Sequence, residues 1–397
     1  MPDYTYVIVG GGMTAAAAIG GIREVDRDGT IAVIGAEPHV PYDRPPLSKG
    51  LWKGSPMESI WRKIDSHAVS IHERRTVQNV DRINKRVTDD QGISYGYSKL
   101  LLATGATPRR LPFGGDGIIY FRTLNDYQRL RGMADQGTRF VTIGGGFIGS
   151  EIAAALAMNG KQVVMVFPDA AIGGRMFPPE LANFLSDYYR EKGVEVLAGM
   201  SVIGCETRGG KTIVTIRDKR TQADREIVAD GVVAGIGVEP NIELAQVAGL
   251  TLDNGIRVDS SLRTSDPNIY AAGDVASFFS RSLNVWRRVE HEDNANTMGA
   301  LAGAAIAGRD VSYEYLPFFY SDLFELGYEA VGDVDSRLEI MADWKTPNRE
   351  GMVYYLRDGK VRGALLWNIF GQVDAARKLI ESARPLDSTE LKAHQRA

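Results

Sequence analysis

Two glycine-rich turns constrain the fold of this chain more than any other feature. The first turn spans Gly10–Gly12 and follows the strand-like run 6–9, and the second spans Gly144–Gly146 and follows the run 140–143. In such a turn the first glycine permits the bend, the next lets backbone N–H groups approach a pyrophosphate, and a small third residue lets the helix pack on the strand. One such turn can be a simple strand-to-helix connection. Two predict two dinucleotide-binding units, and two dinucleotides usually meet in one protein to exchange a hydride.

A small residue and a downstream carboxylate complete each turn. The small third residue is Ala15 in the first turn and Gly149 in the second, and the next strand-like runs end in Glu37 and Asp169. A carboxylate at this place accepts hydrogen bonds from a free ribose diol and repels a 2′-phosphate. The second nucleotide is therefore predicted to be NADH rather than NADPH. Arg175, six residues after Asp169, carries the opposite charge and could oppose this preference.

Length and composition narrow the class of protein. A chain of 397 residues is longer than a domain with a single hydrophobic core usually is, so two or three domains are expected. The net charge of −4 gives no sign of a nucleic-acid-binding surface. No apolar run reaches membrane-spanning length, and the first strand-like run begins at residue 4, which leaves no room for a targeting segment. We therefore expect a cytoplasmic protein that neither spans a membrane nor binds nucleic acid.

The single cysteine restricts the redox chemistry. A flavoprotein that reduces disulfides or peroxides needs a redox cysteine, usually a pair, against the flavin. Cys205 follows a strand-like run and is expected to pack as a small core residue. One cysteine and five scattered histidines provide no cluster of ligands for zinc or for an iron–sulfur centre. No metal site is predicted.

The order of the apolar runs divides the chain into three predicted domains. Residues 1–115 and 249–310 form the first dinucleotide-binding domain, residues 116–248 form an inserted second one, and residues 311–397 form a domain without a dinucleotide signature. The expected fold class is α/β, with two Rossmann-like domains of the ββα type and a C-terminal α+β domain. Strands are expected near 139–143, 162–167, 194–197, 212–217, 227–236, 329–334, 338–342, 351–356 and 361–367, and a helix near 371–383.

Further motifs match a known family of proteins. They lie at 44–49, 103–105, 144–151, 272–274, 289–291 and 319–322. With them the chain resembles the two-dinucleotide FAD/NAD(P) flavoproteins of the glutathione-reductase type. Within these it resembles the branch of bacterial ferredoxin and rubredoxin reductases, monodehydroascorbate reductase and apoptosis-inducing factor. The stretches Phe167–Asp169 and Gly327–Ala330 look most similar to apoptosis-inducing factor and its bacterial relatives. The resemblance covers residues 4 to about 383 and implies FAD and NADH as cofactors.

The resemblance implies a set of FAD contacts. Gly10, Gly12 and Ala15 would hold the pyrophosphate, Glu37 the adenosine ribose, Val77 the adenine and Asp274 the ribityl chain, with Arg44 and Arg122 as further contacts. Lys49 would lie at the flavin N5 edge, and Glu151 would pair with it. A lysine ammonium there stabilises the negative charge of a reduced flavin, and a buried lysine needs such a partner.

The resemblance also implies a set of NAD contacts. They are Gly145, Gly146, Phe147, Ile148, Asp169, Arg175 and Gly237, with Glu290, His291 and Glu329 around the nicotinamide. Tyr320 stands where the family usually has a tryptophan against the flavin, and Glu292 stands where an aromatic residue or histidine is common. Lys49, Glu151 and His291 are the implied catalytic residues.

Each catalytic residue also has a purely structural interpretation. Lys49 could be a solvated loop lysine, and Glu151 could be a helix-start acid that complements the helix dipole. His291 could be a hydrogen-bonded structural histidine. Tyr320 lies in an aromatic stretch and could simply pack in the core.

The resemblance and the cysteine count together predict an NADH-dependent FAD oxidoreductase that passes electrons on without a redox disulfide. The expected acceptor is a small iron–sulfur protein, a ferredoxin or rubredoxin; oxygen, a quinone or a small organic radical are alternatives. The arginine pairs Arg109–Arg110 and Arg287–Arg288 could steer an acidic carrier, or could be ordinary solvated residues. The alternative from another class is a redox sensor like apoptosis-inducing factor. In such a sensor a stable reduced-flavin/NAD charge-transfer complex would control partner binding or dimerisation, so a homodimer is possible.

Overall fold

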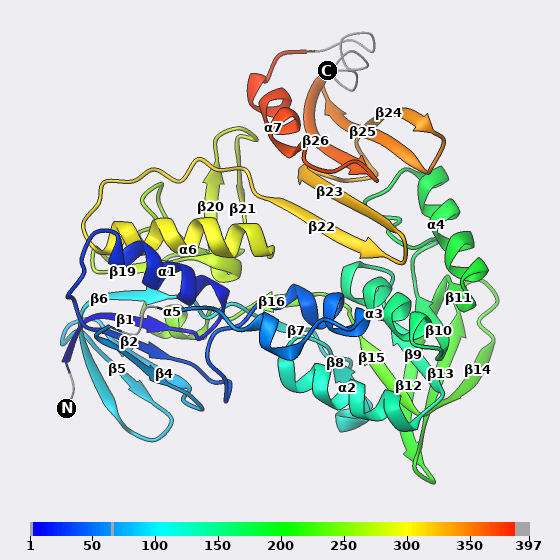
Figure 1. Cartoon of the computed structure of the whole chain (residues 1–397), viewed down its shortest axis with the longest axis horizontal. Helices are drawn as coiled ribbons and strands as arrows, with labels where there is room; N and C mark the ends of the chain where they lie inside the picture. The colour runs from blue at the N-terminus through cyan, green and yellow to red at the C-terminus, as the bar shows by residue number, and fades with distance from the viewer. Residues whose placement is uncertain (1–2, 65–66, 386–397) are drawn as a thin grey trace. The chain divides into compact units, whose positions relative to one another are not determined.

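The computed structural model describes residues 3–64 and 67–385 and divides into two compact units (Figure 1). The first unit comprises Met1–Arg44, Met57–Thr107 and Glu239–Pro317, and the second comprises Pro45–Pro56, Pro108–Val238 and Phe318–Ala397. Residues 386–397, the end of the predicted C-terminal domain, lie outside the described residues. The three predicted domain boundaries stay a prediction.

A seven-stranded sheet forms the centre of the first unit. Its order is β3-β2-β1-β6-β5-β4, and β19 also pairs with β6. The strands are β1 (Asp3–Val9), β2 (Ile31–Ile34), β3 (Val69–His72), β4 (Val77–Asp81), β5 (Arg86–Asp89), β6 (Ser94–Leu102) and β19 (Ile269–Ala271). Strands β3, β2, β1, β6 and β19 run parallel, whereas β4 and β5 pair antiparallel. Because β1 is central, Val7 and Ile8 are fully buried, which explains the apolar run before the first glycine turn.

Two helices of the first unit pack against each other at very short range. They are α1 (Met13–Arg23) and α6 (Glu292–Ile306), which lie side by side in Figure 1. A Cβ atom added at Gly303 of α6 would lie 2.1 Å from the carbonyl oxygen of Ala18 in α1, so only glycine permits this approach. Helix α6 thereby holds α1, the helix that follows the first glycine turn, in place.

The rest of the first unit consists of short elements. They are the 3-10 turns η3 (Met57–Ile60) and η5 (Gly273–Val275), helix α5 (Glu243–Val247), and a sheet of β17 (Leu252–Asp253), β18 (Gly255–Arg257), β20 (Ala276–Ser280) and β21 (Val285–Arg287). Strands β7 (Ala106–Pro108) and β16 (Val238–Pro240) pair with each other where the chain leaves and re-enters the first unit.

A second parallel sheet lies in the second unit, in the order β11-β10-β9-β15-β8. Its strands are β8 (Ile118–Tyr120), β9 (Arg139–Ile143), β10 (Gln162–Phe167), β11 (Val194–Ala198) and β15 (Gly231–Ala234). The accompanying helices are α2 (Leu124–Gln136), α3 (Phe147–Met158) and α4 (Pro179–Glu191), with the turns η1 (Pro45–Leu47), η2 (Gly50–Lys53) and η4 (Gly115–Gly117). The predicted strands at 139–143, 162–167 and 194–197 are confirmed.

A three-stranded antiparallel sheet follows, made of β12 (Met200–Arg208), β13 (Lys211–Asp218) and β14 (Asp224–Ala229). The single strand predicted at 227–236 is wrong, because it is two strands, β14 and β15, that separate at Asp230. The Asp230 carboxylate accepts hydrogen bonds from the backbone N–H groups of Thr138 (2.7 Å) and Arg139 (2.9 Å). That side chain fixes the chain where it passes from one sheet to the other.

The C-terminal part of the second unit is an antiparallel sheet in the order β22-β23-β26-β25-β24, with one helix against β23 and β26. Its elements are β22 (Phe318–Leu323), β23 (Leu326–Gly332), β24 (Glu339–Thr346), β25 (Glu350–Arg357), β26 (Lys360–Trp367) and α7 (Val373–Ser382). Four of these strands and the helix were predicted, whereas β22 was not. The predicted class, mixed α/β with parallel sheets and a C-terminal β-rich domain, is confirmed.

No helix within residues 3–64 and 67–385 is long and apolar enough to cross a membrane.

The close packing of α1 against α6 makes a testable prediction. Gly303→Ala should destabilise the protein by about 1–3 kcal/mol, because the added methyl group must push the two helices apart. Gly20→Ala is the matched control: Gly20 is an exposed helical glycine of α1 with no atom within 4 Å of an added Cβ. It should stabilise the protein by about 0.5–1 kcal/mol. Denaturant unfolding measures both, and equal effects of the two substitutions would contradict the packing.

Candidate active site

The two glycine turns have almost the same backbone conformation. Gly10 and Gly144 both have φ of +117°. The N-cap residues that follow, Gly12 and Gly146, have φ/ψ of −94°/−164° and −93°/−163°. The first glycine of each turn occupies a region of φ that other residues rarely adopt. The chain therefore builds one strand–turn–helix loop twice, once in each unit.

Both loops fit a bound pyrophosphate. A Cβ atom on Gly10 would lie 2.1 Å from the carbonyl oxygen of Ala103, and one on Gly149 would lie 2.1 Å from that of Gly144. A Cβ on Gly12 or Gly146 would meet nothing within 4 Å, so each helix begins at an open position. Neither α1 nor α3 has a side-chain cap or an acidic residue in its first turn. Unsatisfied N–H groups beside open space are what a phosphate group requires.

Glu37 follows β2 and is held by two neighbours in the first unit. Arg44 donates to its Oε1 and Tyr42 donates to its Oε2, each at 2.5 Å. The Glu37 side chain keeps 29% of its surface exposed, so lone pairs stay available to a ribose diol. Val77, the predicted adenine contact, is buried and begins β4. Ala15 is fully buried in α1, as its packing role requires.

Asp274 lies in the turn η5, and a buried arginine braces that turn from the same unit. The Arg288 Nη1 donates to the carbonyl oxygen of Asp274 at 3.0 Å and forms a 2.6 Å ion pair with Oε1 of Glu290. Only 8% of the Arg288 side chain is exposed. The prediction that Arg288 belongs to an exposed docking pair is therefore wrong, because its guanidinium is used inside the fold.

His291 is the N-cap residue of α6 in the first unit. Burial lowers the pKa of His291 to about 4; the Asp274 charge opposes this shift and the Arg287 charge adds to it. The imidazole is therefore neutral at neutral pH. Glu292, the position where the family often has another residue type, begins the first turn of the same helix.

In the second unit the structure brings Lys49 and Glu151 together. The Lys49 Nζ lies 2.7 Å from Oε1 of Glu151, and the two side chains are only 11% and 3% exposed. The centroid of the Tyr320 ring lies 5.3 Å from the same Nζ, within the range of a cation–π contact. The interpretation of Lys49 as a solvated loop lysine is therefore wrong.

The short segment that carries Lys49 is fixed to the helices of the second unit. The Trp52 indole N–H donates to the carbonyl of Leu47 at 2.8 Å, and the carbonyl of Trp52 accepts from the Asn159 side chain at 3.1 Å. The Trp52 ring also meets the Tyr127 ring edge-on, with centroids 5.6 Å apart. These contacts hold the loop on α2 and on the residue that ends α3, so Lys49 is presented from a rigid support.

The predicted NAD residues lie in the second unit around the second glycine turn. Arg175 Nε lies 3.2 Å from Oδ1 of Asp169, and their side chains are 82% and 36% exposed. The Phe147 ring, at the start of α3, meets Phe319 of β22 edge-on with centroids 5.4 Å apart. Gly237 has φ of +96°, and its carbonyl accepts from the backbone N–H of Arg109 at 3.0 Å.

Other predicted residues take part in local structure. The backbone N–H of Arg122 donates to Asp126 at the start of α2 at 3.1 Å, and Glu329 of β23 accepts from the backbone N–H of Gly371 at 2.9 Å. Glu290 and His291 belong to the first unit and Glu329 to the second. Their meeting around a nicotinamide stays a prediction, as does the FAD contact of Arg122.

Four residues make contacts that the sequence did not predict. They are Tyr42, which holds Glu37; Arg288, which holds Asp274; and Ser48 and Ser321, which both hydrogen-bond Glu151. Ser48 and Ser321 adjoin Lys49 and Tyr320 within motifs that resemble the family, and that adjacency was the available signal. Nothing in the sequence pattern marks Arg288 as buried.

Among the described residues, neither the cysteine nor any cluster of metal-ligating side chains indicates a redox or metal site. Cys205 lies on β12 and is partly buried, and burial raises the pKa of its thiol, which disfavours the reactive thiolate. No group of three or more His, Cys, Asp or Glu side chains in residues 3–64 and 67–385 could hold a metal ion.

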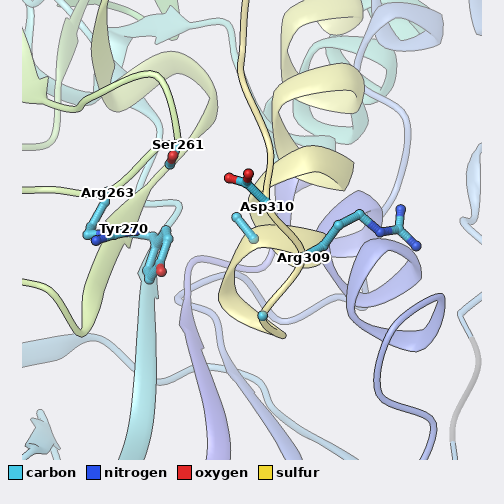
Figure 2. A pocket seen from close by; sticks show the side chains of 7 residues that line it. Ser261, Arg263, Tyr270, Arg309 and Asp310 are labelled. Atoms are coloured by element: carbon cyan, nitrogen blue, oxygen red, sulfur yellow. The ribbon is translucent and has the colours of Figure 1, made fainter.

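A polar pocket of about 250 Å³ also lies in the first unit (Figure 2). Its lining includes Ser261, Arg263, Tyr270, Arg309 and Asp310, and none of the predicted site residues. Arg309 pairs with Glu24 at 2.9 Å, and Figure 2 shows its side chain extending away from Asp310. This pocket is therefore separate from the glycine turns.

Comparison with known proteins identifies the family. Residues 4–299 match the pyridine nucleotide-disulphide oxidoreductase family, and residues 345–382 match the C-terminal domain of mitochondrion-associated apoptosis-inducing factor. The chain belongs to the pyridine nucleotide-disulphide oxidoreductase family. Its sequence contains one cysteine, so no disulfide can form within it.

Similar proteins match along almost the whole chain. The ferredoxin–NAD(+) reductase component of the anthranilate 1,2-dioxygenase system of Burkholderia cepacia is 34% identical over 97% of this chain and 96% of its own. Apoptosis-inducing factor 1, mitochondrial, of Dictyostelium discoideum is 32% identical over 99% of this chain and 81% of its own. The reductase in a covalent putidaredoxin reductase–putidaredoxin complex superposes with a TM-score of 0.90 at 30% identity, covering 99% of this chain and 96% of its own.

The fold, the two loops and these relatives together define the class of enzyme. The protein is an NAD(H)-dependent flavoprotein oxidoreductase that resembles ferredoxin reductases and uses FAD and NAD(H).

The depressed pKa of His291 predicts a pH-dependent stability. Between about pH 6.5, the ordinary value, and about pH 4, the unfolded chain binds a proton that the folded chain does not. Stability is therefore lost as the pH falls through this window, by up to about 2 kcal/mol between pH 7.5 and 5. His291→Gln should remove this part of the slope in denaturant unfolding. His67→Gln, at a side chain that is 64% exposed, is the control and should leave the slope unchanged. An identical slope in His291→Gln and the parent would contradict the burial of the neutral imidazole.

Proposed function

We propose that this enzyme passes electrons from NADH through FAD to a small iron–sulfur carrier, such as a ferredoxin or a rubredoxin, without a redox disulfide. The observation that carries the proposal is the match over nearly the full length of both chains to reductases of iron–sulfur carriers. The partly buried Cys205, whose thiol has a raised pKa, supports the route without a thiol. FAD suits this task because, when bound, it accepts two electrons as a hydride and can release them singly.

The Lys49–Glu151 pair is the proposed electrostatic support of the redox-active flavin. A buried ammonium stabilises negative charge that develops next to it, because the surrounding dielectric is low. The ion pair with Glu151 fixes the direction of the Lys49 ammonium. The Tyr320 ring, at 5.3 Å from Nζ, limits the other directions in which the lysine can swing. Asp274 and Glu37 are the proposed FAD contacts of the first unit.

Asp169 supports a preference for NADH over NADPH. Its carboxylate would repel a 2′-phosphate, whereas it can accept hydrogen bonds from a ribose diol. Arg175, the residue that could oppose this preference, pairs with Asp169 at 3.2 Å. The Asp169 carboxylate therefore already neutralises part of the positive charge of Arg175 before any nucleotide binds. The strength of the preference depends on whether the exposed arginine leaves this partner.

A second candidate function is a redox sensor like apoptosis-inducing factor. The match of residues 345–382 to the C-terminal domain of that protein favours it, as does the 32% identity to the Dictyostelium protein. Slow reoxidation together with NADH-dependent dimerisation would support the sensor. Rapid steady-state reduction of an added iron–sulfur carrier would support the reductase.

Two exposed arginines are the proposed steering residues for an acidic carrier. Arg109 and Arg110 are exposed and directly follow β7, and the Arg110 guanidinium lies 5.0 Å from the centroid of the Tyr120 ring. Arg288 is excluded because it is buried. Positive charge on the exposed surface raises the rate at which an acidic carrier protein associates with the enzyme. Dissolved salt screens this attraction.

Carrier reduction at increasing salt tests this proposal. With a [2Fe–2S] ferredoxin, and separately with a rubredoxin, kcat/KM should fall about threefold or more as salt rises from low to physiological ionic strength. Arg109→Ala and Arg110→Ala should lower kcat/KM at low salt and flatten the salt dependence, while NADH oxidation by a small dye is preserved. Arg208→Ala, at an exposed arginine paired with Glu206, is the control. If neither carrier is reduced faster than oxygen, the reductase proposal fails; if reduction is fast but indifferent to salt and to both substitutions, only the steering role fails.

A further inference from the structure

We propose that Ser48 and Ser321 are positioning residues that fix the Glu151 carboxylate by hydrogen bonds and thereby hold Lys49 in its working orientation. The inference rests on the proposed role of the Lys49–Glu151 pair in flavin reduction. It is independent of the identity of the electron acceptor, because it concerns only the step in which NADH reduces the flavin.

The contacts to Glu151 use both of its oxygens. Ser48 Oγ donates to Oε2 at 2.5 Å, and Ser321 Oγ donates to Oε1 at 2.6 Å. Lys49 shares Oε1 with Ser321, at 2.7 Å. Ser48 and Ser321 are 5% and 1% exposed, and Glu151 is 3% exposed. The carboxylate therefore receives three donors, two of them neutral, in a place that water scarcely reaches.

Such an arrangement satisfies both oxygens of a buried carboxylate. Burial alone favours a neutral carboxylic acid, whereas hydrogen bonds donated to the carboxylate favour the anion. One lysine supplies one charge and reaches one oxygen, so the second oxygen would be unsatisfied without Ser48. Hydrogen bonds to an ionised acceptor are stronger than those between neutral groups. The two hydroxyls therefore supplement Lys49 in a way that a second cation would not, because they leave the net charge of the site unchanged.

The other titratable groups around Glu151 are tyrosines. Burial raises the pKa of Tyr189 and Tyr328 well above the ordinary value, and the negative charge of Glu151 raises both further. The Tyr189 hydroxyl donates to the carbonyl of Ser150 at 2.9 Å. Both tyrosines stay neutral over the pH range in which a carboxyl group titrates.

The two serines come from separate segments that also contact the lysine. Ser48 directly precedes Lys49 in the chain. Ser321 and Tyr320 are successive residues of β22, and they contact Glu151 and Lys49 respectively. The C-terminal sheet thus reaches both members of the ion pair. A strand shift that moved Tyr320 away from the lysine would also remove the Ser321 donor from the carboxylate.

The pH profile of flavin reduction tests the proposal. Ser321→Ala and Ser48→Ala each remove one donor and should move the acid limb of the rate of anaerobic flavin reduction by NADH upward by about one pH unit. On that limb the rate should be about tenfold below the parent at equal pH, while the dissociation constant of NADH stays the same. Ser277→Ala is the matched control: Ser277 is fully buried in the first unit and donates to the Asp253 carboxylate at 3.3 Å, whereas Glu151 belongs to the second unit. It should show the parental profile.

Glu151→Gln in the same assay separates the possible failures. If it slows reduction and abolishes the acid limb while both serine variants keep the parental limb, the positioning role is overturned and the role of the ion pair stands. If Glu151→Gln reduces the flavin at the parental rate, the proposed role of the pair is wrong, and the inference fails with it. Should Ser321→Ala not fold, Ser48→Ala decides alone, because its hydroxyl reaches the other oxygen.

Discussion

The buried ion pair between Lys49 and Glu151 is the interaction on which the site depends. Burying two charges costs several kcal/mol, and the cost is recovered only where the geometry is good and further hydrogen bonds satisfy both groups. This requirement explains why three separate segments of the second unit converge there: the turn with Ser48 and Lys49, helix α3, and strand β22 with Tyr320 and Ser321. Removing one member would leave an unpaired charge in the interior. The ion pair therefore holds the three segments together, and the segments in turn hold the pair in place.

The two glycine turns show how one structural solution serves two cofactors. Gly10 and Gly144 share the same φ, and the N-cap glycines after them have the same conformation within one degree. The two units differ in the residues that surround these loops. Glu37 after the first loop is held by Tyr42 and Arg44, whereas Asp169 after the second pairs with the exposed Arg175. We propose that both loops hold phosphate and that the side chains around the two carboxylates distinguish the nucleotides.

The sequence predicted those features that depend on local patterns. The glycine turns, the parallel strands on either side of them and the strands of the C-terminal sheet follow from apolar periodicity and from turn chemistry, which neighbouring residues determine. The strand predicted at 227–236 failed because Asp230 breaks it through hydrogen bonds to the distant residues Thr138 and Arg139. The serine contacts to Glu151 were not predicted for the same reason. They join residues separated by 103 and 170 positions, and only the folded chain brings them together. The burial of Arg288 was not predicted either, although its partner Asp274 lies only 14 positions away, because no local pattern marks it.

A double-mutant cycle between Lys49→Met and Glu151→Gln tests the central claim most directly. Both the rate of flavin reduction by NADH and the free energy of unfolding would be measured in the parent, the two single variants and the double variant. Each single substitution should slow reduction and destabilise the fold, and the second should cost much less than the first, with a coupling free energy of about 1–3 kcal/mol. Additive effects on both quantities would show that the two residues act independently and would contradict the account.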